Sequence, residues 1–429
     1  MNRTNCLLPR WFAAVLTVLL WLAAGPAWAL IDGITGPVFN LTAKDGYIST
    51  GDGDSIYSWG YANADGTMQY PGPTLIVNQG DTVTVNLANA LPVPVSIVFP
   101  GQSGVTVSGG GSGLLTREAA AGQTVTYTFT ASHAGTYQYH SGTQPALQVE
   151  MGLLGALIVR PSNVADPLHQ AYAHPGTAFS REYLFLLTEM DPVIHRRVEN
   201  QVKAGAPVDV DTSAYQPVLW FINGRAAPDT MLDAGVPWLP TQPYNAMPRM
   251  HPGEKLLMRV IGGGRDLHPF HTHGNNFWIL ARDGRVLESA PGAGPDLAVS
   301  DFTLRTVPGE TYDAVFEWTG KGLGWDVYGH APGDPLAPNE YAPDHGKSIA
   351  SLPLVLPNLQ DVTYGANYSG SPYLGRFGDL PPGAVVVNEN AGYFHMWHSH
   401  NEREIVNNDI FPGGMMTMLI IEPAHVFIP

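Results

Sequence analysis

Two short blocks of histidine lie far apart in the chain and share one spacing. They read HPFHTH at residues 268–273 and HMWHSH at residues 395–400. Side chains alternate faces along an extended strand, so His271 and His273 should share one face, as should His398 and His400. The first histidine of each block falls at an odd offset and should point elsewhere. Neutral imidazole binds copper, zinc, iron and nickel, so the two blocks predict a metal site built from several histidines.

The composition indicates a β protein. The 429 residues are enough for two or three domains, and they include 48 glycines and 37 prolines but only 14% charged residues. Turn-forming residues at this density favour short strands over helices. The formal net charge of −16 argues against nucleic acid or an anionic membrane as a partner.

Residues 1–29 have the composition of a secretory signal. Arg3 and Arg10 form a basic n-region, an apolar run covers residues 11–25, and Ala27-Trp28-Ala29 is an A-x-A cleavage site. The apolar run is short for a membrane span, and no later stretch qualifies as one. These features predict a periplasmic or secreted protein. The only cysteine, Cys6, would leave with the signal, so the mature chain would have no disulfide and no thiolate ligand.

The strand pattern divides the rest of the chain into two parts. Short alternating runs over residues 30–162 predict a Greek-key β-sandwich, and residues 163–180 lack periodicity and are expected to be a linker. A second run of strands over residues 181–429 predicts a second sandwich. Within it, residues 319–382 are rich in Gly, Pro, Tyr and Asp and are expected to form a long inserted loop. We expect no long amphipathic helix.

Five motifs together resemble the multicopper oxidases, the cupredoxin-fold family of laccases and their relatives. They are Tyr70–Thr74 with Gly80–Val83, Gly135–Ser141 with Gly152–Val159, Asn223–Arg225 with Pro228–Thr230, His268–Gly274, and His398–His400 with Gly414-Met415. The first two motifs fall in the first sandwich and the last two in the second, which is typical of the two-domain branch. The resemblance implies an all-β fold of two cupredoxin-like Greek-key sandwiches, the second carrying the inserted loop.

The resemblance also implies that one copper site of the family is lost. In such enzymes a mononuclear blue (type 1) copper, held by a cysteine thiolate, two histidines and usually a methionine, passes electrons to a trinuclear cluster that reduces dioxygen. His268 would be one of those histidines, but Ser399 occupies the cysteine position and Glu404 the other histidine position. Met415 or Met416 would be the axial residue only if residues 401–413 contain an insertion relative to the family. Without a thiolate no blue copper can form.

The trinuclear cluster is better preserved. The family's first H-x-H-G motif reads here as Val98–Gly101 and has lost both histidines, whereas the other cluster motifs keep five of their six, so five of the eight cluster positions survive. The resemblance assigns one to three coppers to these five histidines, which are His140, His271, His273, His398 and His400. His268, His395 and His133 are weaker candidates because they fall outside the cluster positions. Water can fill the open positions, and an open position is what a substrate or oxygen needs.

Three functions follow as hypotheses. The first is an exported copper-dependent oxidoreductase that works at a histidine-only (type 2/type 3-like) site without a type 1 copper. Its partners would be a small reductant or a metal-ion substrate and dioxygen, and a homotrimer could complete the site. The second is a non-catalytic periplasmic copper-binding or carrier protein. The third is a degenerate cupredoxin module used for assembly, because function depends on the site and not on the fold.

Overall fold

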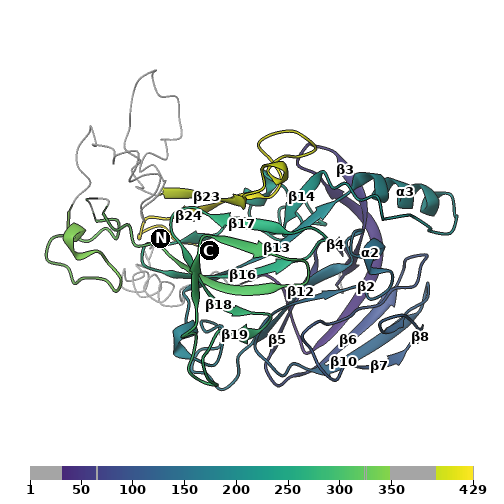
Figure 1. Cartoon of the computed structure of the whole chain (residues 1–429), viewed down its shortest axis with the longest axis horizontal. Coiled ribbons are helices and arrows are strands. Elements are labelled where there is room, and N and C mark those ends of the chain that lie inside the picture. Colours follow the sequence, from purple (N-terminus) through teal and green to yellow (C-terminus); the bar gives the residue numbers. More distant parts are fainter. Residues whose placement is uncertain (1–30, 64–65, 323, 325, 348–392, 429) are drawn as a thin grey trace, which may run out of the picture.

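The strands form two β-sandwiches of two sheets each (Figure 1). The computed structural model describes residues 31–63, 66–322, 324, 326–347 and 393–428. The predicted signal (1–29), with Cys6, and residues 348–382 of the predicted insertion lie outside this range. The predicted all-β class is confirmed. No helix in the described part of the chain is long and apolar enough to cross a membrane.

The N-terminal sandwich encloses one apolar core between a four-stranded and a six-stranded sheet. The smaller sheet contains, in spatial order, β1 (Ile34–Thr35), β5 (Gly72–Asn78), β12 (Leu154–Arg160) and β11 (Gly135–His140). The larger contains β4 (Met68–Gln69), β3 (Ser55–Ala62), β2 (Val38–Ser49), β6 (Thr82–Asn89), β10 (Thr124–Thr130) and β7 (Thr106–Gly109). The short pair β8 (Gly111–Ser112) and β9 (Arg117–Glu118) and the short helix α2 (Pro145–Gln148) complete this half. Alternation is clearest in β6, where every second residue is buried.

The C-terminal sandwich has the same plan with more strands. Its first sheet contains β14 (Leu219–Ile222), β13 (Arg181–Met190), β16 (Lys255–Gly262), β22 (Thr311–Glu317), β18 (Phe277–Arg282) and β19 (Arg285–Val286), with β20 (Val299–Asp301) beside β18. The second contains β15 (Arg249–Met250), β24 (Met416–Ile421), β23 (Tyr393–Ser399), β17 (His268–Thr272) and β21 (Thr303–Thr306). Phe270 and Trp397 pack inward against Phe185 and Phe316 of the first sheet. This packing fixes β17 and β23 side by side.

A buried network of charges joins the two sandwiches. Arg160 of β12 pairs with Glu182 of β13, and the other oxygen of Glu182 accepts from Arg259 Nε at 2.8 Å. Arg259 in turn donates to Thr136 Oγ1 of the first sandwich at 3.0 Å. The segment between the sandwiches, residues 161–180, contains only the 3₁₀ turn η1 (Pro175–Thr177), but it is packed as well, because Ala171 and Phe179 are buried. The two halves therefore share an interface.

One helix corrects the expectation that the chain has no long amphipathic helix. α3 (Pro192–Lys203) has twelve residues and buries Ile194, His195 and Val198. Asp191 caps it by accepting from the Val193 N–H at 2.9 Å, and Pro192 stands at the first helical position. His195 hydrogen-bonds to the Tyr57 carbonyl of β3 at 2.6 Å and fixes the helix on that strand. The Asp-Pro start was a sequence signal for this helix.

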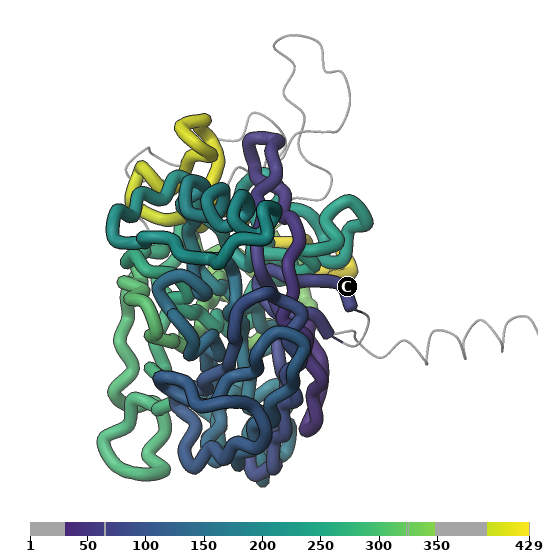
Figure 2. Tube along the Cα trace, turned by 90° about the vertical axis from the view of Figure 1, so that its right-hand side faces the viewer, coloured from purple at the N-terminus to yellow at the C-terminus, as the bar shows by residue number. Residues whose placement is uncertain are grey.

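The loop after β23 lies at the same end of the molecule as the turn between β2 and β3. Figure 2 shows both projecting there, in yellow and purple. They are in contact, because a Cβ added at Gly51 would lie 2.2 Å from the side chain of Asn407. The loop contains the 3₁₀ turn η4 (Glu402–Glu404), and Asn407 anchors it by donating to the Ala227 carbonyl at 2.7 Å. This anchoring holds Glu404 in a fixed place. Two further 3₁₀ turns are η2 (Asp229–Met231) and η3 (Ala342–Asp344).

Candidate metal centre

Four of the predicted histidines lie together on the outer face of the five-stranded sheet. β17 and β23 pair antiparallel with His271 directly opposite His398. Strand alternation sends Phe270 and Trp397 into the core and the histidines outward. The ring centre of His271 is 4.9 Å from that of His273, 5.5 Å from that of His398 and 4.8 Å from that of His400. The two blocks, separated by more than a hundred residues, therefore meet.

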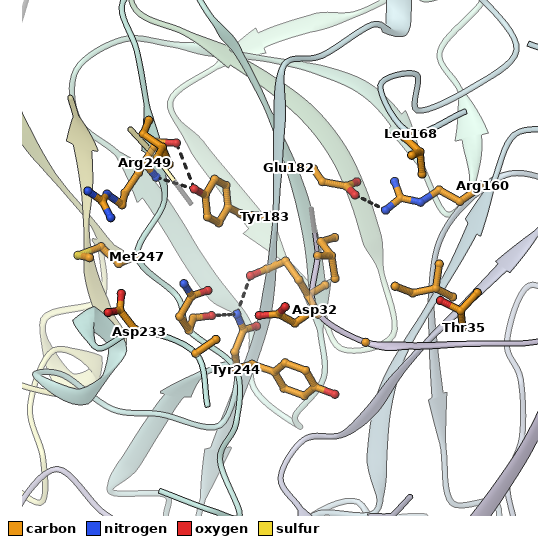
Figure 3. A pocket seen from close by; sticks show the side chains of 18 of the residues that line it. Asp32, Thr35, Arg160, Leu168, Glu182, Tyr183, Asp233, Tyr244, Met247 and Arg249 are labelled. Carbon is orange, nitrogen blue, oxygen red and sulfur yellow. Dashed lines mark hydrogen bonds and ion pairs between the residues drawn. The ribbon is translucent and has the colours of Figure 1, made fainter. Parts of the chain in front are cut away.

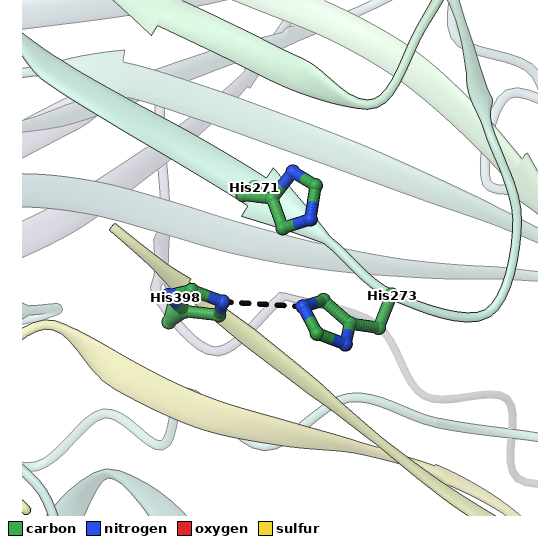
Figure 4. A group of neighbouring side chains, drawn as sticks. All are labelled: His271, His273 and His398. Carbon is green, nitrogen blue, oxygen red and sulfur yellow. Dashed lines mark hydrogen bonds between the residues drawn. The ribbon is translucent and has the colours of Figure 1, made fainter. Parts of the chain in front are cut away.

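Three of these histidines have the spacing of ligands to one ion. One ring nitrogen from each of His271, His273 and His398 can be chosen so that all three lie within 4.8 Å of one another. The Nε2 atoms of His273 and His398 are 3.2 Å apart and face each other (Figure 4). Two imidazole nitrogens bound to one metal at about 2.0–2.1 Å, at a tetrahedral angle, lie about 3.3 Å apart. The residues present therefore fit a bound transition-metal ion.

Hydrogen bonds to the other ring nitrogens leave Nε2 available. His398 Nδ1 donates to the Ser399 carbonyl at 2.6 Å, and His271 Nδ1 hydrogen-bonds to Thr303 Oγ1 at 2.8 Å. Such second contacts fix the tautomer and the orientation of metal-binding histidines. Thr303 on β21 was missed by the sequence analysis, because its place beside His271 depends on strand pairing and on no local motif.

The electrostatics of the group favour neutral imidazole. Burial lowers the pKa of His271 to about 4, with repulsion from His273, His398 and His400 adding to the effect. Burial likewise lowers the pKa of His273 to about 4, and it lowers the pKa of His398. A metal needs the unprotonated ring, so these nitrogens are ready to bind without first losing a proton at neutral pH.

His140 and His395 lie outside this group. His140 ends β11 in the N-terminal sandwich, where its Nδ1 donates to the Ser141 carbonyl at 2.9 Å and burial lowers its pKa. His395 is 1% exposed and its ring packs against Gly274 and, at 5.9 Å between centres, Trp318. The structure thus brings together four of the seven predicted residues. His133, the further candidate, is exposed in the N-terminal sandwich.

His268 lies inside the sandwich between two carboxylates. Its Nε2 donates to Glu189 of β13 at 2.8 Å and its Nδ1 to Glu404 of η4 at 2.9 Å. Ser399 donates to the same Glu404 oxygen at 2.6 Å, and Asn401 Nδ2 donates to the other at 2.8 Å. His268, Ser399 and Glu404 are the positions that the family resemblance assigns to the blue copper. A buried, hydrogen-bonded charge network occupies that place here, and both nitrogens of His268 are engaged in it.

This network predicts that the folded protein becomes less stable at alkaline pH. The hydrogen bonds to Glu189 and Glu404 outweigh burial and raise the pKa of His268 to about 9. Protonated His268 therefore stabilises the fold fully below its unfolded pKa of about 6.5, and the contribution is lost as the pH rises through about 9. Urea denaturation of the metal-free protein should show the free energy of unfolding falling by about 3 kcal/mol over this window. A His268→Gln variant should lack the decline, and an equal decline in both proteins would contradict the assignment.

A large cavity lies away from the histidines. Its volume is about 800 Å³, and residues of both sandwiches line it, including Arg160, Glu182, Tyr244 and Arg249 (Figure 3). None of its lining residues is a histidine. The cavity is therefore separate from the candidate metal centre.

The fold resembles that of known multicopper oxidases. Residues 61–164 match the multicopper oxidase family profile. A blue copper oxidase from Nitrosomonas europaea superposes with a TM-score of 0.55 at 20% identity, covering 89% of this chain and 85% of that chain. The multicopper oxidase mgLAC superposes with a TM-score of 0.57 at 19% identity, covering 91% and 87%. At these identities the likeness establishes the cupredoxin-like fold.

Curated sequences match over shorter stretches. A multicopper oxidase of Talaromyces pinophilus is 39% identical over 23% of this chain and 17% of its own length, and a laccase of Aspergillus fumigatus is 36% identical over 37% and 27%. Copper resistance protein A of Escherichia coli is 25% identical over 58% of this chain and 42% of its own length. Each match thus covers less than half of the relative. Fold and site define a cupredoxin-like protein with a cluster of outward-facing histidines. Residues 61–164 are thus similar to the multicopper oxidase family, whose members bind copper, and the chain as a whole shares the cupredoxin-like fold.

Proposed function

We propose that this protein is an exported copper-dependent oxidoreductase whose metal site is built from histidine alone. His271, His273 and His398 would hold the copper, with His400 at the exposed rim. The observation that carries the proposal is that ring nitrogens of His271, His273 and His398 lie within 4.8 Å of one another on one sheet face. Cu(II) stands highest among the common divalent metals in affinity for such a donor set. The apolar run and A-x-A sequence before residue 30 support export.

Neighbouring residues of the chain fix the orientation and separation of the histidines. Thr303 and the Ser399 carbonyl orient His271 and His398, and the pairing of β17 with β23 sets their separation. Copper, when bound, would supply one-electron exchange with a small reductant or metal ion and with dioxygen as acceptor. Because the carboxylate network of His268 stands at the blue-copper position, electrons would enter from a substrate at the histidine cluster itself. Phe302 is 53% exposed, with its ring 5.6 Å from that of His271, and would form one wall for a small reductant.

A second copy of the chain would complete the site in a homotrimer. His140 belongs to the other sandwich, yet its Nδ1 contact with the Ser141 carbonyl repeats that of His398 with Ser399, leaving Nε2 available in the same way. The four-histidine face points outward, so a neighbouring copy can reach it. The number of coppers, one to three, would depend on this assembly. Analytical ultracentrifugation should find a trimer that keeps more copper per chain than the monomer, and a monomer with full copper content would exclude this arrangement.

A copper carrier is the second candidate. His400 is exposed at the edge of the group, an access route that suits transfer of the ion as well as catalysis. Oxygen consumption separates the two functions. The copper-loaded protein should consume oxygen with at least one of a phenol, ferrous or manganous ion, or ascorbate, and copper should exchange slowly with a chelator. Stoichiometric copper with no oxygen consumption and rapid exchange would instead establish the carrier.

The absence of a thiolate gives a further prediction. The sequence has one cysteine, at position 6 in the predicted signal, and Ser399 stands where the family resemblance expects another. The mature copper-loaded protein should therefore lack the intense blue absorption of a copper–thiolate bond. An absorption spectrum of the oxidised protein checks this. An intense blue colour would contradict the proposal.

A further inference from the structure

Carboxylates and imidazoles gather in the described segment that follows β22. That segment appears in light green at the left of Figure 1. The group consists of Asp326, His330, Glu340 and His345, each of which offers one ligand atom within 4.8 Å of the others. It shares no residue with the histidine centre on β17 and β23. Nothing in the proposed redox function uses it.

Each imidazole of the group lies close to both carboxylates. His345 Nδ1 is 2.6 Å from Glu340 Oε1 and 3.8 Å from Asp326 Oδ2. His330 Nδ1 is 3.2 Å from Glu340 Oε2 and 3.5 Å from Asp326 Oδ2. Every pair thus joins a ring nitrogen to a carboxylate oxygen, which is an N₂O₂ donor set.

Two observations point to a ligand between these groups. The Nδ1 atom of His330 is buried, is directed at the carboxylates and makes no hydrogen bond to any described residue. The side chains of Asp326 and Glu340 are only 1% and 3% exposed and offer oxygens within 4.8 Å of each other, so a divalent cation between them would offset the repulsion of two buried negative charges. A cation at the centre would contact the His330 nitrogen and both carboxylates.

The surrounding backbone holds the donors in place. His345 Nε2 donates to the Asp334 carbonyl at 2.8 Å, which leaves Nδ1 as the nitrogen that faces the group. Asp326 accepts from the N–H groups of Tyr328 at 2.8 Å and Gly346 at 2.7 Å, and Glu340 accepts from that of Ala337 at 2.7 Å. Each carboxylate keeps further lone pairs for an ion. These contacts orient the ligand atoms before any ion binds.

From this geometry we propose that Asp326, His330, Glu340 and His345 bind one divalent first-row transition-metal ion, separately from the copper centre. Two imidazoles select for Zn²⁺, Co²⁺, Mn²⁺ or Fe²⁺ over Ca²⁺ and Mg²⁺, which prefer all-oxygen sites. The ligands come from positions 326–330 and 340–345, so the ion would tie the two ends of this segment together. A set of two histidines and two carboxylates leaves room for water or a further ligand.

The test uses Co²⁺ as the probe, because its visible spectrum reports nitrogen and oxygen coordination. The first centre is removed by His271→Ala and His398→Ala in the full chain, and the metal-free protein is titrated by absorption and by calorimetry. One equivalent of Co²⁺ should still bind, and Zn²⁺ should displace it. Adding His330→Ala or Glu340→Gln should weaken Co²⁺ binding at least about 10-fold.

Asp344→Asn is the matched control. Asp344 lies in the same segment, and its replacement by Asn removes one negative charge, as Glu340→Gln does. Its carboxylate instead lies 3.6 Å from Lys347 Nζ and 3.2 Å from the Gly324 N–H. It should leave Co²⁺ affinity within about twofold of the parent. Because the His330 side chain is 24% exposed, His330→Ala should fold even if Glu340→Gln does not. No Co²⁺ bound in the parent, or equal weakening by His330→Ala and Asp344→Asn, would overturn the proposal.

Discussion

Replacing His271 and His398 together by alanine should reduce the protein's affinity for Cu(II) at least about 100-fold, because two of three converging nitrogens are removed. Both side chains project from the outer sheet face, and their strands are held by inward residues such as Phe270 and Trp397. The variant should therefore fold normally. Copper content after dialysis against a weak chelator, measured by elemental analysis, checks the result.

His133→Ala provides the control for this experiment. It removes an exposed imidazole from the N-terminal sandwich and should leave copper content unchanged. A single His400→Ala change should have an intermediate effect, because His400 lies 4.8 Å from His271 between ring centres but is outside the set of three whose nitrogens converge. Copper content in the double variant equal to that of the His133→Ala protein would show that these histidines do not bind the metal.

Glu404→Ala should destabilise the protein by about 3–5 kcal/mol, because breaking a buried ion pair leaves an uncompensated charge. Glu404 is 3% exposed and accepts hydrogen bonds from His268, Ser399 and Asn401. Its removal would leave His268 with Glu189 alone. Urea denaturation of metal-free protein near neutral pH measures the change in the free energy of unfolding.

Glu402→Ala is the natural comparison because it removes an acid from the same 3₁₀ turn. Glu402 is exposed, so its loss should change stability by no more than about 0.5 kcal/mol. Glu404→Gln should lie between the two, since an amide oxygen can still accept a hydrogen bond from protonated His268. Equal stability of the Glu404→Ala and Glu402→Ala proteins would contradict the role given to the buried network.

The pairing of histidines could be predicted because strand alternation is a local property. The two-residue spacing of His271 and His273, and of His398 and His400, is enough to place each pair on one face. The sequence could not show that His271 stands opposite His398, since register between strands so far apart is decided by the packing of residues such as Phe270 and Trp397. The two sandwiches were likewise predicted from alternating runs and turn residues.

The carboxylate partners of His268 could not be predicted from local sequence patterns. The two partners of His268 are Glu189, 79 residues earlier, and Glu404, 136 residues later. No spacing rule connects such positions. The motif alignment identified Ser399 and Glu404 as departures from the copper ligands, but the compensating Glu189 appeared only in the folded structure. The four proposed ligands of the second site likewise lie in a segment that was expected only to be a long inserted loop, where no periodic pattern relates one ligand to another.

The electron paramagnetic resonance spectrum of the protein loaded with Cu(II) tests the central proposal most directly. Coordination by imidazole alone predicts a non-thiolate copper signal with nitrogen coupling that His271→Ala alters and His133→Ala does not. A signal that is identical in the wild type and the His271→Ala/His398→Ala variant, or one with the narrow copper splitting of a thiolate site, would contradict it.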